Sequence, residues 1–132
     1  MKRNYLGILA SIVIISVSLF PFTDAKSENI ANWTIMYYMC SDVKNTDIVW
    51  TYPLIENLTK IRSSPDLNIV VLNDGFQRGD LQLFYIDING EKIDLTQKFG
   101  WPSEVDTSNL NTLELFTKQM MQAYPAKHYC LI

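Results

Sequence analysis

Apolar and polar positions alternate in blocks from Trp33 to the last residue, and three blocks predict buried strands. Residues 33–40 and 67–72 are almost unbroken apolar runs. Runs of this length are typical of strands covered on both faces in a parallel sheet. A shorter run at 128–132 follows Pro125 and predicts a third buried strand.

A hairpin is predicted between the second and third of these strands. Residues 81–88 alternate between apolar and polar for much of their length, as a half-exposed strand does. Asn89-Gly90 is a strong signal for a tight turn, and residues 91–95 can return as the partner strand. We interpret this pair as a small antiparallel hairpin inserted between the second and third predicted strands.

Two segments have helical periodicity. Pro53 suits a first helical turn, and the residues after it place one apolar face on a helix: Leu54, Ile55, Leu58 and Ile61. A second helix is predicted to begin near 109–111, where Asn111 and Glu114 resemble a capping box, and to end at Pro125. Its predicted apolar face contains Leu110, Leu113, Phe116, Met120 and Tyr124.

The order strand, helix, strand, hairpin, helix, strand predicts an α/β fold. The sheet is expected to be mostly parallel, with flanking helices and a small β-hairpin insertion. In such sheets, functional groups gather beyond the carboxyl ends of the strands. The last strand, 128–132, reaches the end of the chain, so groups that would follow it are expected beyond Ile132.

The N-terminal residues have the pattern of an export signal. Lys2 and Arg3 precede an apolar run at 6–20, and Thr23-Asp24-Ala25 offers small residues for cleavage. We predict a signal peptide at 1–25, a linker at 26–32 and one domain at 33–132. The alternative is an uncleaved N-terminal anchor. Either reading places the domain outside the cytoplasm, with membrane contact only through this segment.

Composition excludes several classes of protein. The chain has 132 residues, enough for one domain, and a formal net charge of −3 without a block of like charge. It therefore lacks the basic footprint of a nucleic-acid-binding protein. Its two cysteines, Cys40 and Cys130, have no zinc-type spacing with the single His128, and a disulfide between them is the less favoured reading.

The residues offer only weak catalytic candidates. Cys40 ends the first predicted strand, where a nucleophile could lie, although a small cysteine is more often part of a core. His128 and Cys130 share one face of a strand and could form a thiol and base pair. Same-face neighbours on one strand rarely align for proton transfer, so we favour a boundary role for His128.

Asp42 and Asp74 each follow a predicted buried strand. Because parallel strands end at one edge, both carboxylates should face the same side of the sheet, where they could bind a cation or a basic substrate side chain. The simpler reading is that both are turn-forming aspartates.

The chain from about residue 33 to 132 resembles the clostripain family of cysteine peptidases. The resemblance is carried by the strand 33–39 with Asp42 after it, and by 68–72 with Asp74 after it. It continues through the hairpin segment 83–86. Its remaining parts are Phe99-Gly100-Trp101, Ser103-Glu104-Val105, Tyr124-Pro125-Ala126-Lys127 and Tyr129-Cys130-Leu131-Ile132.

This resemblance implies a partial caspase-like sandwich and a Cys–His endopeptidase that acts on peptides, often after Arg or Lys. In the family, a Trp-Asp-His-Gly segment with the catalytic histidine follows such a strand, and the nucleophilic cysteine comes one strand later. Both would lie beyond Ile132, so the chain is expected to be inactive alone, and no catalytic residue is assigned here. Asp42 is the predicted substrate-binding residue. Calcium dependence occurs in parts of the family, but no metal ligand is assigned.

The resemblance has two departures, and alternatives remain open. Residues 43–46 and 106–108 differ from the usual family loops, and both border the expected active-site edge.

The chain could also be a processed light chain held by a separate heavy chain. A different class of protein, a non-enzymatic exported α/β binding module, would use the Asp42 and Asp74 edge for a partner or a cation. Without its missing part, the last strand should expose an apolar edge that is prone to association.

Overall fold

The two long apolar runs form neighbouring strands in the middle of a sheet. The computed structural model describes residues 30–42 and 47–132. Strand β1 spans Ala31–Cys40 and β2 spans Leu67–Asp74, and they pair in parallel with Cys40 opposite Asp74. Both are longer than predicted. In particular, Asp74 belongs to β2 and does not form a turn, so the turn reading was wrong for this residue.

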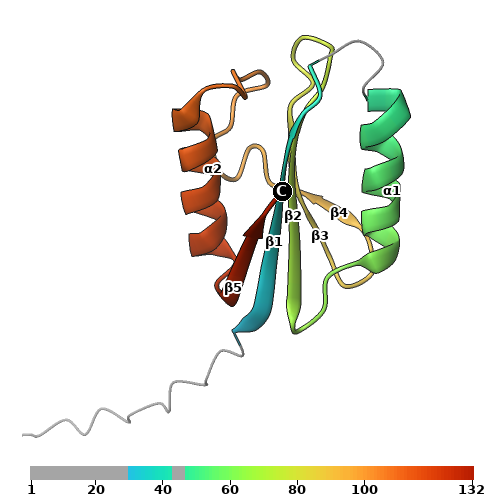
Figure 1. Cartoon of the computed structure of the whole chain (residues 1–132), viewed down its shortest axis with the longest axis vertical. Coiled ribbons are helices and arrows are strands. Elements are labelled where there is room, and N and C mark those ends of the chain that lie inside the picture. The colour runs from blue at the N-terminus through green and yellow to red at the C-terminus, as the bar shows by residue number, and fades with distance from the viewer. Residues whose placement is uncertain (1–29, 43–46) are drawn as a thin grey trace, which may run out of the picture.

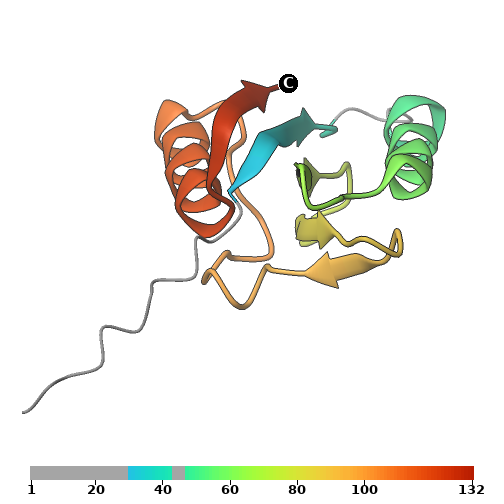
Figure 2. The same cartoon turned by 90° about the horizontal axis from the view of Figure 1, so that it is seen from below.

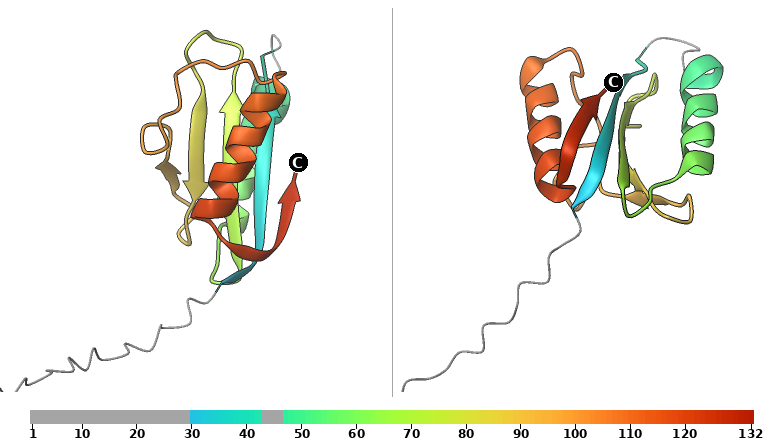
Figure 3. Two further views of the ribbon diagram at one scale, coloured as in Figure 1. Left: turned by 90° about the vertical axis from the view of Figure 1, so that its left-hand side faces the viewer. Right: turned by 60° about the horizontal axis from the view of Figure 1, so that its bottom comes forward.

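The sheet has five strands in the order β4-β3-β2-β1-β5 (Figures 1 and 3). Strand β5 (Ala126–Leu131) runs parallel to β1. The predicted hairpin is present as β3 (Gln82–Ile86) and β4 (Lys92–Asp94). It continues the same sheet, because β3 pairs antiparallel with β2. The α/β class is confirmed, and the sheet is mixed because the hairpin extends it.

One helix covers each face of the sheet (Figure 1). The first is α1 (Tyr52–Ile61), preceded by a short π-helix, η1 (Asp47–Thr51), which the sequence pattern did not predict. Pro53 lies in the first turn of α1, as expected. The predicted apolar face was too wide: Ile55 and Leu58 are buried, whereas Leu54 and Ile61 are exposed.

The second helix, α2 (Leu110–Ala123), is capped by a residue other than the predicted one. The Asn109 side chain accepts a hydrogen bond from the Asn111 backbone N–H, so Asn109 and not Asn111 is the N-cap. Phe116 and Met120 are buried as predicted, but Leu110 is 74% exposed. No helix in the described ranges is long and apolar enough to span a membrane.

Two apolar clusters hold the helices on the sheet. The α2 side of the sheet carries the larger cluster, formed by Met36, Val70, Leu72, Leu81, Leu83, Leu95, Trp101, Phe116 and Met120. The α1 side carries a smaller one, formed by Ile55, Leu58, Ile69, Val71, Phe84 and Ile86. The smaller cluster takes its strand residues from β2 and β3, so α1 lies over that half of the sheet.

The face of β1 and β5 on the α1 side is therefore only partly covered. Figure 2 shows α1 beside β2 and away from β5. Trp33 is 45% exposed, and no residue of β5 is buried. The prediction that 128–132 is a buried strand is wrong for the described chain, because nothing in it packs on the outer side of β5.

A glycine in the hairpin turn should be far less tolerant of substitution than a second glycine of similar conformation. Gly90 has φ +85°, and a Cβ there would lie 2.3 Å from the Thr59 carbonyl oxygen of α1. Gly100 has φ +71° with open space around it. We expect Gly100→Ala to cost about 1 kcal/mol, from left-handed backbone alone. Gly90→Ala should cost about 2 kcal/mol or more, because the turn must also move away from α1. Urea unfolding of both variants measures the difference, and equal losses would contradict the close contact.

Candidate functional site

Strands β1, β2 and β5 end at one edge of the sheet, and the acidic residues singled out in the sequence lie there. Cys40 ends β1, Asp42 follows it, and Asp74 ends β2. The segment 103–108, which leads into α2, contacts the same edge. In Figure 1 this edge is at the top of the sheet. The parallel pairing that brings Asp42 and Asp74 together is the one expected from the sequence.

A pocket of about 260 Å³ opens beside β1 at this edge. Asp42 and Cys40 are exposed and lie in its wall. The rest of its lining is formed by Val105, Asp106, Thr107 and Ser108. Asp42 therefore lines a pocket, which is compatible with the binding role predicted for it.

Thr107 is the point at which the 103–108 segment is attached to the strands. The Tyr38 hydroxyl donates a hydrogen bond to the Thr107 carbonyl oxygen at 3.0 Å, and the Cys40 thiol approaches the same oxygen at 3.8 Å. The Thr107 hydroxyl donates to Asp74 Oδ2 at 3.4 Å. The pocket wall is thus tied to both β1 and β2. The sequence offered no signal for this role, because Thr107 lies in an irregular loop.

Asp74 is an unusual carboxyl group for a strand end. It is 1% exposed, and its Oδ1 has no hydrogen-bond partner within the described ranges. Burial, followed by the negative charges of Glu104, Asp42 and Asp80, raises the pKa of Asp74 to about 6, although the Thr107 hydrogen bond acts in the opposite direction. The sequence located this residue but did not indicate its burial.

The same surroundings disfavour ionisation of Tyr38. Burial, and then the charges of Cys40, Asp74 and Asp106, raise the pKa of Tyr38 to about 12. Its hydroxyl therefore stays protonated and able to donate to Thr107 throughout the neutral range. The edge combines neutral donors with acidic groups.

The remaining carboxylates of this edge are engaged in local structure. Asp80 accepts hydrogen bonds from the backbone N–H groups of Gly75 and Gln77, both at 2.9 Å. Glu104 accepts a hydrogen bond from Gly79 N–H, which joins the 103–108 segment to the loop after β2. Across the described ranges, no three His, Cys, Asp or Glu side chains are grouped so that they could hold a metal ion. We therefore assign no calcium ligands among the described residues and no step to calcium.

The other candidates lie away from this edge. His128 is near the start of β5, and its ring packs against Trp33 with centroids 4.8 Å apart. Cys130 lies opposite Ile35, several positions along β1 from Cys40. Both cysteines are free thiols, so a disulfide between them is not formed. Neither His128 nor Cys130 is brought together with Asp42 or Asp74.

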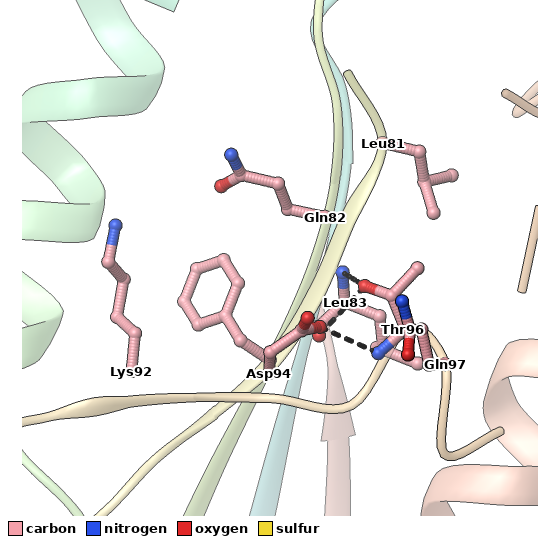
Figure 4. A pocket seen from close by; sticks show the side chains of 8 residues that line it. Leu81, Gln82, Leu83, Lys92, Asp94, Thr96 and Gln97 are labelled. Atoms are coloured by element: carbon pink, nitrogen blue, oxygen red, sulfur yellow. Dashed lines mark hydrogen bonds between the residues drawn. The ribbon is translucent and has the colours of Figure 1, made fainter. Parts of the chain in front are cut away.

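A second pocket, of about 390 Å³, lies at the β3–β4 hairpin, and Figure 4 shows its lining. Its polar groups mainly stabilise the chain after β4. Asp94 accepts a hydrogen bond from Thr96 N–H at 2.8 Å, and the Thr96 hydroxyl accepts one from Leu83 N–H at 3.1 Å. The hydrogen bonds from Thr96 lower the pKa of Asp94. We therefore treat this pocket as structural.

Comparison with known proteins identifies the fold. No family model matches the sequence, and the search of curated proteins finds no match. Among solved structures, a Bacteroides fragilis cysteine protease superposes with a TM-score of 0.56 at 14% identity, over 78% of this chain and 86% of that chain. A clostripain from Bacteroides thetaiotaomicron, solved with a peptide inhibitor, has a TM-score of 0.49 at 14% identity, over 78% and 88% of the two chains.

At this level of identity the likeness concerns the path of the chain. It includes the mixed five-stranded sheet and the helices on its two faces. The fold implied by the sequence resemblance is confirmed, and it covers nearly all of the described residues. This chain therefore has the α/β fold of the B. fragilis cysteine protease.

Proposed function

We propose that this chain is the N-terminal portion of an exported clostripain-like cysteine endopeptidase and that it is inactive alone. The observation that carries the proposal is the fold shared with the B. fragilis cysteine protease across 78% of the chain. The complete enzyme would hydrolyse peptide bonds through a Cys–His dyad, with thiolate attack, an acyl-enzyme and hydrolysis. The sequence resemblance puts both dyad residues beyond Ile132.

The acidic edge would supply one side of the substrate groove. Asp42 lines the pocket beside Cys40, and its exposed carboxylate could pair with a basic side chain of a peptide. This agrees with the preference for Arg or Lys that the resemblance implies. Neither Cys40 nor Cys130 takes the role of nucleophile in this proposal.

Strand β5 offers a place for the rest of a peptidase domain. It pairs with β1 on one side and is at the edge of the sheet on the other. Leu131 and Ile132 are 45% and 60% exposed there. A parallel strand added to this edge would bring its own carboxyl end beside those of β1 and β5. That strand could come from the same chain or from a separate heavy chain.

The first test is the activity of the chain alone. We expect no cleavage of fluorogenic peptides with Arg or Lys before the reporter, because no dyad is assembled, and no change on Cys40→Ala or Cys130→Ala. Labelling with a thiol alkylating reagent confirms that both cysteines are accessible in the assay. Turnover that is lost on either substitution would contradict the proposal.

The second test restores the missing part. The coding DNA directly downstream of Ile132 is examined for a Trp-Asp-His-Gly segment, and the chain is co-expressed with the polypeptide that carries it. Activity on the same peptides should appear, and replacing that histidine with alanine should abolish it. A stop codon with no such segment, together with a monomeric and cooperatively folding chain, would favour the non-enzymatic binding module.

A further inference from the structure

The buried carboxyl of Asp74 lies directly beneath the wall of the edge pocket. It is covered by the 103–108 segment through Thr107, whose hydroxyl lies 3.4 Å from Oδ2. The other oxygen, Oδ1, has no partner within the described ranges. A buried carboxylate with an unsatisfied oxygen is costly, whereas the protonated acid carries no charge in the same place. The covered arrangement therefore suits the protonated form.

Every element around Asp74 adds acidic groups. The end of β1 contributes the Asp42 carboxylate, next to the uncharged Tyr38 hydroxyl and the Cys40 thiol, and the loop after β2 contributes Asp80. The covering segment contributes Glu104 and Asp106. The basic residue of the loop after β2, Arg78, is exposed to solvent. Ionisation of Asp74 would thus add a negative charge to a group of negative charges.

The covering segment, 103–108, is the part of this edge that can move when Asp74 ionises. It is joined to the loop after β2 by Glu104, which accepts from Gly79 N–H, and by the Ser103 carbonyl, which accepts from Leu81 N–H at 3.1 Å. Glu104 is also the largest charge acting on Asp74. Moving this segment outward would take the Glu104 carboxylate away from Asp74 and would uncover the carboxyl group that Thr107 contacts. The same movement would open the wall formed by 105–108 beside Asp42 and Cys40.

We propose that Asp74 is a proton-controlled latch for the 103–108 segment, which keeps the pocket wall closed in mild acid and releases it when Asp74 loses its proton. The proton passes to solvent as the pH rises, and no covalent bond other than O–H is broken. The Thr107 hydrogen bond favours the carboxylate, but at 3.4 Å it is long and does not outweigh the burial and the surrounding charges. The latch is a property of this chain and does not depend on the proposed peptidase function.

Hydrogen exchange of the full 132-residue chain tests the latch. Protection factors for the Gly79 and Leu81 amides, corrected for the intrinsic pH dependence of exchange, are measured between pH 4.5 and 7.5. We expect a fall of about tenfold or more, with a midpoint near the raised pKa of Asp74, about 6. Asp74→Asn, which cannot ionise, should remain protected at all these pH values. Asp94→Asn, in the distant hairpin pocket, is the matched control and should leave the midpoint unchanged.

Two further variants move the midpoint in opposite directions. Glu104→Gln removes the largest charge that opposes ionisation of Asp74, so the midpoint should fall. Thr107→Val removes a hydrogen bond that favours the carboxylate, so the midpoint should rise. These variants keep the test decisive if Asp74→Asn does not fold. The proposal would be overturned if the pH midpoint of exchange persisted in Asp74→Asn. It would also be overturned if neither Glu104→Gln nor Thr107→Val moved that midpoint in its expected direction.

Discussion

Replacing Phe116 with alanine is expected to lower the free energy of unfolding by about 3–5 kcal/mol, the largest effect of any substitution considered. Phe116 is fully buried at the centre of the cluster between α2 and the sheet. Its ring lies 5.5 Å from that of Tyr38 and 6.5 Å from that of Trp101, measured between centroids. Alanine would leave a cavity in this cluster. Since small domains are stable by about 5–15 kcal/mol, this loss would be a large share of the total.

Urea unfolding followed by circular dichroism measures this loss. Leu115→Ala is the matched control, because Leu115 is the adjacent residue of α2 and is 49% exposed. We expect it to change stability by less than about 1 kcal/mol. Similar losses for the two variants, or a loss below about 1 kcal/mol for Phe116→Ala, would show that α2 does not pack on the sheet through Phe116.

The strands were predicted well where hydrophobic pattern and turn chemistry agreed. The runs at 33–40 and 67–72 became neighbouring parallel strands, and Asn89-Gly90 became the hairpin turn. Predictions of helix faces were less accurate. Leu54 and Leu110 have the right spacing, but Leu54 lies in the first turn of α1 and Leu110 begins α2. Spacing alone does not reveal how far a helix end extends beyond the sheet.

The candidate site was only partly predictable, because some of its contacts come from residues far apart along the chain. Parallel strands must end at one edge, so the approach of Asp42 to Asp74 followed from topology. The burial of Asp74 depends on Thr107, which is far along the chain and lies in a segment without periodicity. Loop contacts of this kind are set by tertiary packing and leave no local pattern. The exposure of β5 likewise depends on what packs beside it.

Asp74 should also make the stability of the whole chain depend on pH. Its pKa is raised from 3.8 to about 6 in the folded chain. The folded chain therefore binds this proton more tightly than the unfolded chain. The resulting stabilisation is fully present below the unfolded pKa, and it is lost as the pH rises through about 6. Each pKa unit corresponds to about 1.4 kcal/mol, so the loss should reach up to about 3 kcal/mol.

Other carboxyl groups make the folded chain less stable as the pH falls, which is opposite to the effect of Asp74. Hydrogen bonds lower the pKa values of Asp87, Asp94 and Asp106, and Lys118 lowers that of Glu114. Their stabilisation is present above their ordinary pKa values and is lost as the pH falls through the lowered ones. The two trends together favour a stability maximum below the pH at which Asp74 loses its proton, about 6.

Urea unfolding at pH 5.0 and pH 7.5 distinguishes Asp74 from these groups. The unmodified chain should be less stable at pH 7.5, whereas Asp74→Asn should have nearly equal stability at the two values, because it has no proton to lose. Asp94→Asn should retain the dependence of the unmodified chain, since the pKa of Asp94 is lowered and the group is ionised at both pH values. If Asp74→Asn lost as much stability between pH 5.0 and pH 7.5 as the unmodified chain, the pH dependence would arise from another group. A chain more stable at pH 7.5 would contradict the burial of an acid with a raised pKa at the end of β2.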